Sequence, residues 1–164
     1  MVKTIKDLQK EIVKLKINFK TLEEFKKFKE YGIQELSMNE ELEANIIEND
    51  SESPFYGIYF SDKLVARMSV YQVSGKYNRY FEPPVDYLEI WKLEVLLEYQ
   101  GRGYGTALVN FAKEFGLPIK TNPRVKSRNF WEKMGFNSVD YNMDRDLGEN
   151  PLIWYPNSVT EGNE

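Results

Sequence analysis

A glycine-rich hexapeptide, QGRGYG at 100–105, places three glycines at alternate positions between two ordered segments. The apolar run YLEIWKLEVLL at 87–97 precedes it and predicts a buried strand. Apolar residues at helical spacing follow it: Tyr104, Leu108, Phe111 and Phe115. Because glycine in such a place costs backbone entropy, three of them favour a loop whose main chain must approach a ligand closely.

Two familiar phosphate-binding motifs do not fit the hexapeptide. A P-loop ends in Gly-Lys-Ser/Thr, whereas Gly105 is followed by Thr106 and no lysine. A dinucleotide fingerprint has glycine where Thr106 stands and an acid about 20 residues later, but 117–128 contains no acid. A pyrophosphate cradle, formed by loop amides and a helix N-terminus, fits better. The alternative is a plain turn with positive φ, which needs only one glycine.

The composition excludes several kinds of chemistry. The chain has no cysteine and no histidine, which removes thiol nucleophiles, Ser-His-Asp triads, disulfides and the usual zinc sites. We therefore expect no metal. The net charge of −4 argues against general binding to nucleic acid or to an anionic membrane. Neither a signal peptide nor a long apolar stretch is visible, so we expect a cytoplasmic protein.

The remaining patterns predict one mixed α/β domain over 1–156, followed by a disordered tail at 157–164. The expected elements are a strand at 11–20, helices opened by capping boxes at Thr21 and Ser37, a hairpin of 55–60 and 64–73, a short strand in LPIKT, a helix at 127–134 closed by Gly135, and last strands in NSVDYNMD and PLIWYP.

Three motifs in register resemble the GNAT superfamily of acyl-CoA-dependent N-acyltransferases. QGRGYG matches the family's Gln/Arg-x-x-Gly-x-Gly/Ala signature, and Leu93-Glu94-Val95 resembles its fourth strand. NFWEKMGF at 129–136 is similar to its Phe-Tyr-Glu-Lys-x-Gly-Phe helix end. The resemblance extends from about residue 11 to 155 and is nearest to a small Gram-positive-type branch. It implies a mixed, mostly antiparallel sheet of six to seven strands, about four flanking helices, and a splay after the fourth strand.

The resemblance also implies how acetyl-CoA binds. Main-chain groups of Leu93, Glu94 and Val95 are expected to pair with the pantetheine arm. The pyrophosphate is expected in the signature loop, formed by Gln100, Gly101, Arg102, Gly103, Tyr104, Gly105 and Thr106. Arg124 stands where the family often has a CoA-binding Asn, and it offers a cation for a CoA phosphate.

The catalytic groups are less clearly marked. Glu89 stands 11 residues before Gln100, where some family members place their general base, and Glu94 is a weaker candidate on the opposite face of the strand. Either carboxylate is alternatively a structural partner of Lys92, Arg67 or Arg79. The family's acidic Tyr is replaced by Trp131, which we expect to be core packing, so Tyr141, Tyr99, Tyr104 or bulk water is left to protonate the thiolate.

We therefore expect an N-acetyltransferase that moves an acetyl group from acetyl-CoA directly to a primary amine, because no cysteine can carry an acyl intermediate. The alternative is a non-catalytic acyl-CoA-binding or regulatory module. The sequence permits a monomer or a homodimer, and it does not identify the acceptor.

Overall fold

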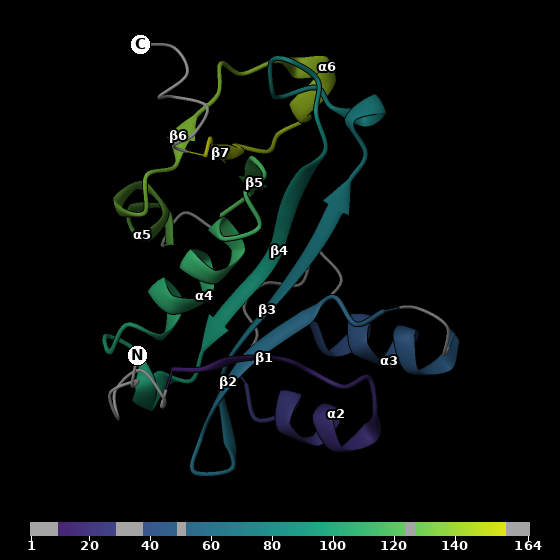
Figure 1. Cartoon of the computed structure of the whole chain (residues 1–164), viewed down its shortest axis with the longest axis vertical. Helices are drawn as coiled ribbons and strands as arrows, with labels where there is room; N and C mark the ends of the chain where they lie inside the picture. Colours follow the sequence, from purple (N-terminus) through teal and green to yellow (C-terminus); the bar gives the residue numbers. More distant parts are fainter. Residues whose placement is uncertain (1–9, 29–37, 49–51, 124–126, 157–164) are drawn as a thin grey trace. The chain divides into compact units, whose positions relative to one another are not determined.

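The computed structural model describes residues 10–28, 38–48, 52–123 and 127–156 (Figure 1). In chain order the elements are β1 (Ile12–Lys14), α2 (Phe19–Phe25), α3 (Met38–Glu48), β2 (Phe55–Phe60), β3 (Lys63–Val73), η1 (Gly75–Tyr77), β4 (Tyr87–Val95), η2 (Leu97–Tyr99), α4 (Tyr104–Lys113), β5 (Ile119–Thr121), α5 (Arg128–Lys133), β6 (Asn137–Ser138), α6 (Met143–Asp146) and β7 (Leu152–Trp154).

The seven strands form a sheet of order β1-β2-β3-β4-β5-β7-β6. Four of its pairs, β1–β2, β2–β3, β5–β7 and β6–β7, are antiparallel, and β4–β5 is parallel. The β4–β5 ladder joins only Leu88–Ile90 to Ile119–Thr121, although β4 continues to Val95. This mixed, mostly antiparallel sheet of seven strands confirms the predicted fold class, whereas a splay after the fourth strand stays a prediction.

The chain divides into two compact units, Met1–Ser69 with Lys92–Leu108, and Val70–Trp91 with Val109–Glu164. The strands β3 and β4 and the helix α4 each contribute residues to both units. A single domain over 1–156 therefore stays a prediction. None of the helices in the described ranges combines the length and the apolar character needed to cross a membrane.

The first unit is built on the hairpin of β2 and β3. Its turn is the pair Ser61 and Asp62, both with positive φ, which matches the twist of the strands. β3 is buried continuously from Leu64 to Val70, as a strand covered on both faces should be. The helices α2 and α3 pack side by side, and the ring of Phe25 meets that of Phe55 edge-on at 5.4 Å (Figure 1).

The second unit ends in β6 and β7, reached through the glycine-capped helix α5. Gly135 has φ 92°, and the amide of Phe136 donates to the carbonyl of Trp131 at 3.1 Å. The ring of Phe136 is buried against Trp131, with centroids 5.1 Å apart. This confirms the predicted helix end and the prediction that Trp131 packs in the core.

Several expected boundaries were wrong. The strand predicted at 11–20 is only three residues long, because Asn18 caps α2 by accepting from the amide of Thr21 at 2.9 Å. Phe19, which falls in the predicted strand, instead begins α2 and is 70% exposed. The strand expected in NSVDYNMD stops at Ser138, and α6 begins at Met143. Ser37 and the tail 157–164 lie outside the described residues.

Candidate active site

The signature loop connects β4 to α4 through the short helix η2. Gly101 and Gly103 have φ values of 76° and 88°, which L-residues adopt only with strain. Gly105 lies inside the first turn of α4 and is absent from the positive-φ glycines of the described chain. Its lack of a side chain is therefore not required by the backbone conformation of the turn.

The N-terminus of α4 presents its amides at this loop. The first helical hydrogen bond runs from the amide of Ala107 to the carbonyl of Gly103 at 3.0 Å. The amides of Tyr104, Gly105 and Thr106 come before this bond, so they have no hydrogen-bond acceptor within the helix itself. Unsatisfied amides and the positive end of the helix dipole together favour an anion.

Aromatic and cationic side chains surround the loop within the same unit. Tyr104 is buried, and its ring lies edge-on to that of Tyr99 at 6.1 Å. The Arg102 guanidinium and the Lys63 ammonium lie 5.3 and 5.7 Å from the centre of the Tyr99 ring. Tyr104 thus anchors the loop from inside, and the exposed Arg102 adds positive charge beside it.

The strand segment Leu93–Val95 is half-buried. The side-chain amide of Gln100 donates to the carbonyl of Val95 at 3.1 Å, so the first residue of the signature ties the loop back to the strand. The amide of Leu96 donates to the carbonyl of Val65 at 2.9 Å. Pairing of Leu93, Glu94 and Val95 with a pantetheine arm stays a prediction.

Glu94 belongs to a buried charge network. Its Oε1 atom accepts from Nη2 and Nε of Arg67 at 2.6 and 3.2 Å, and Arg67 is fully buried. The same guanidinium donates to the carbonyl of Phe25 and to Oδ1 of Asn39, at 3.2 and 2.7 Å. This is the structural pairing with Arg67 that the sequence offered as the alternative for Glu94.

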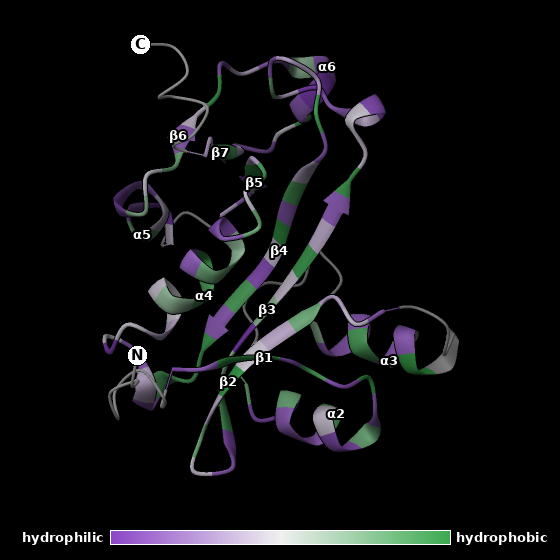
Figure 2. Ribbon diagram, viewed as in Figure 1, coloured by the Kyte–Doolittle hydropathy of each residue, from purple (hydrophilic) through white to green (hydrophobic). Residues whose placement is uncertain are grey.

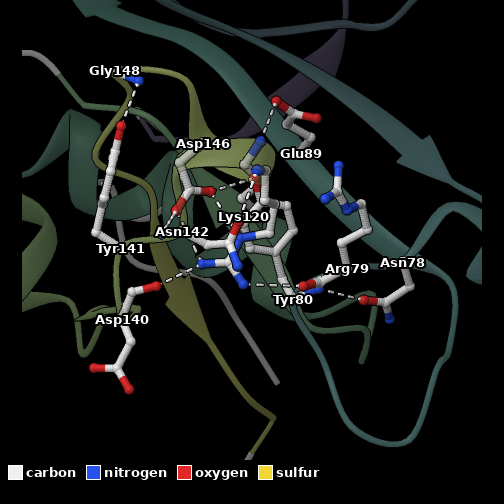
Figure 3. Close-up of polar contacts among 11 residues, drawn as sticks. Asn78, Arg79, Tyr80, Glu89, Lys120, Asp140, Tyr141, Asn142, Asp146 and Gly148 are labelled. Carbon is white, nitrogen blue, oxygen red and sulfur yellow. Dashed lines mark hydrogen bonds and ion pairs between the residues drawn. The ribbon is translucent and has the colours of Figure 1, made fainter.

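Glu89 lies in the second unit, in the cluster shown in Figure 3. Its Oε2 atom lies 3.4 Å from Nζ of Lys120, and the two side chains are 21% and 8% exposed. The ammonium also lies 4.7 Å from the centre of the Tyr80 ring. Glu89 therefore keeps some solvent access, as a proton acceptor requires, while Lys120 holds its carboxylate in place.

The segment 74–86, an insertion between β3 and β4, is bound to α6. The hydroxyl of Tyr80 donates to Oδ1 of the buried Asp146 at 3.1 Å, and burial followed by this contact raises the pKa of Tyr80 to about 12. Arg145 donates to both oxygens of Asp146, at 2.8 and 3.0 Å, and holds the pKa of that carboxyl well below its usual range. Arg145 also donates to the carbonyls of Arg79 and Asp140 (Figure 3).

Tyr141 is 54% exposed, and its hydroxyl oxygen accepts from the amide of Gly148 at 3.1 Å (Figure 3). The hydroxyl proton is therefore left to donate elsewhere, as an acid requires. Arg124 lies outside the described residues. The described residues contain no group of three acidic side chains suited to a metal ion.

Sequence reasoning missed two polar residues of the second unit. Lys120 stands in the short strand β5, whose three residues are all buried, and a lysine within a predicted short strand was the available signal. Oδ1 of Asn122, just after the last β4–β5 pair, is buried and has no hydrogen-bond partner among the described residues. No local pattern in the sequence distinguishes that amide from an ordinary loop residue.

Comparison with known proteins agrees with this geometry. The family model described as "Acetyltransferase (GNAT) family" matches residues 19–136. An uncharacterized N-acetyltransferase of Bacillus pumilus is 72% identical and covers 89% of this chain and 92% of its own length. One of Halalkalibacterium halodurans is 65% identical, with coverages of 93% and 90%.

Solved structures are also similar to this chain. The Bacillus subtilis N-acetyltransferase YlbP, crystallised in complex with coenzyme A, is 71% identical, with a TM-score of 0.77 over 90% of this chain and 97% of its own. A Pyrococcus horikoshii protein, at 20% identity and a TM-score of 0.58, shares the fold. The chain therefore belongs to the acetyltransferase (GNAT) family of acetyl-CoA-dependent N-acetyltransferases.

Proposed function

We propose that the chain transfers an acetyl group from acetyl-CoA to a primary amine, in one step and without an acyl-enzyme. The observation that carries this proposal is the signature loop, where two positive-φ glycines lead into the N-terminal amides of α4. The same segment matches the family signature, and YlbP is recorded with coenzyme A. The absence of cysteine from the whole chain supports direct transfer.

The loop residues 100–106 are proposed to hold the pyrophosphate, with Arg102 as the cation, and Leu93–Val95 the pantetheine arm. Arg124 is a further proposed phosphate ligand. Acetyl-CoA supplies an activated thioester carbon, to which the amine nitrogen bonds as the carbon–sulfur bond breaks. In these assignments acetyl-CoA is bound mainly by main-chain groups. Its affinity should therefore depend more on the backbone conformation of these segments than on their side chains.

Glu89 is the proposed general base, because an amine must lose a proton before or during attack. Its carboxylate is partly exposed and is held by Lys120 at 3.4 Å. Glu94 is the less suitable candidate, since its Oε1 atom is already bound twice by Arg67. Tyr141 is the proposed acid that returns a proton to the departing thiolate.

A second candidate, a non-catalytic acyl-CoA-binding module, is favoured by two observations. Both Glu89 and Glu94 have cationic partners, and Trp131 packs in the core where the family's acid often stands. Thiol release from acetyl-CoA over a panel of amines distinguishes the two. The enzyme releases CoA thiol only with an accepted amine, and the binding module binds acetyl-CoA without releasing thiol. A cytoplasmic location and a monomeric or dimeric state stay predictions.

A further inference from the structure

Lys10 reaches the signature loop from a distant part of the sequence. Its Nζ atom lies 2.8 Å from the position that a Cβ atom would take on Gly103. It also lies 5.8 Å from the centre of the Tyr104 ring. The missing side chain of Gly103 therefore leaves room for an ammonium group at the start of α4.

The charge of Lys10 has no counter-ion in the described part of the chain. Lys14, four residues further along the chain, is by contrast paired with Glu52 at 3.2 Å. Lys10 has only the weak ring contact with Tyr104, at the outer edge of the distance range for such interactions. In a chain of net charge −4, an ammonium directed at a helix N-terminus without a carboxylate is suited to an anionic ligand.

We propose that Lys10 is a ligand of the CoA pyrophosphate and closes the cradle opposite the loop amides. This inference rests on the proposed function and adds a residue that lies outside the signature motif. The pyrophosphate is the fitting group, because Nζ lies against Gly103, whose carbonyl begins the first turn of α4. The 3′-phosphate of CoA is a separate anion, and the test distinguishes the two.

The test is calorimetric titration of the full chain and its Lys10→Met variant with CoA and with dephospho-CoA, which lacks the 3′-phosphate. Methionine keeps an aliphatic stem against Tyr104 and removes only the charge. We expect the Kd of Lys10→Met to rise about tenfold for both ligands. This is at the low end of the effect of losing a hydrogen bond to a charged group, because Lys10 is half-exposed. The Kd of the variant should also depend less on salt.

Lys16→Met is the matched control, because Lys16 is an exposed lysine a few residues along the same segment. It should bind both ligands like the unmodified chain, and Lys10→Arg should restore most of the affinity. Unchanged affinity of Lys10→Met would overturn the role of Lys10, and weakening for CoA alone would overturn the pyrophosphate assignment. Failure of the unmodified chain to bind CoA would instead overturn the proposed function.

Discussion

The ammonium of Lys120 lies 3.4 Å from the carboxylate of Glu89, and only 8% of the lysine side chain is exposed. A buried cation that depends on one carboxylate makes that carboxylate structurally necessary, whatever its chemical role. Any test of Glu89 as a base must therefore separate catalysis from stability.

Glu89→Gln should lower kcat for the accepted amine by about 10²- to 10³-fold, because general-base catalysis contributes that much. It should also lower the free energy of unfolding by about 1–2 kcal/mol, less than for a fully buried pair because Glu89 keeps solvent contact. Thiol-release kinetics and thermal unfolding measure the two effects. Glu132→Gln is the control, since its pair with Arg128 is exposed and both properties should stay unchanged.

The double variant Glu89→Gln/Lys120→Met separates the two roles. Removing both charges should restore much of the stability, because no unpaired buried ammonium remains. If Glu89 is the base, kcat stays low in the stable double variant. Recovery of kcat together with stability would show that Glu89 acts only as the partner of Lys120.

Gly101→Ala and Gly103→Ala test the cradle against the plain turn. Each forces an L-residue into positive φ and should cost about 1–2 kcal/mol of stability. Gly116→Ala, at φ 77° with open space around it as at Gly101, should cost the same as Gly101→Ala and serves as its control, whereas Gly103→Ala also displaces the Lys10 ammonium. Only the two loop variants should lose CoA affinity in calorimetry. Equal affinity in all three variants would mean that the loop geometry serves the fold alone.

Asp146→Asn tests the attachment of the insertion to α6. Because Arg145, and after it other contacts, depress the pKa of Asp146 in the folded state, its carboxylate stabilises the protein above the unfolded pKa of about 4. That contribution is lost as pH falls below about 4 toward the folded pKa. The variant should therefore have a lower Tm at neutral pH, with a gap to the unmodified chain that narrows in acid. Asp144→Asn, on the exposed face of α6, should change neither the Tm at neutral pH nor its dependence on pH.

Tyr141→Phe removes the proposed acid and leaves the ring in place. We expect kcat to fall about 100-fold at neutral pH, with a stability change of about 0.5 kcal/mol from the exposed contact with Gly148. Tyr59→Phe, on the exposed side of β2, should leave thiol release unchanged. An unaltered kcat in Tyr141→Phe would assign the proton to another donor or to water.

The features that sequence predicted well are local ones. The end of α5 depends on Gly135 and Phe136 within a few residues of each other, and the hairpin turn at Ser61 follows from its flanking strands. In Figure 2, β4 changes repeatedly between apolar and polar residues along its length, so the strand expected to be buried from the run 87–97 is only partly buried.

The features that sequence did not predict depend on distant partners. Arg67 is fully buried in an apolar strand because Phe25, Asn39 and Glu94 converge on its guanidinium from other segments. Nothing near Lys10 in sequence indicates that it meets Gly103. The start of α2 was misplaced because Thr21 and Asn18 are both acceptable caps, and tertiary packing decides between them.

Thiol release from acetyl-CoA, measured with a panel of peptide N-termini, lysine peptides, polyamines and aminoglycosides, tests the central claim most directly. The proposed activity predicts that at least one primary amine raises thiol release well above the amine-free rate, with one acetylated amine formed for each thiol. An acetyl-CoA complex that forms normally, yet releases no thiol with any amine of the panel, would contradict it.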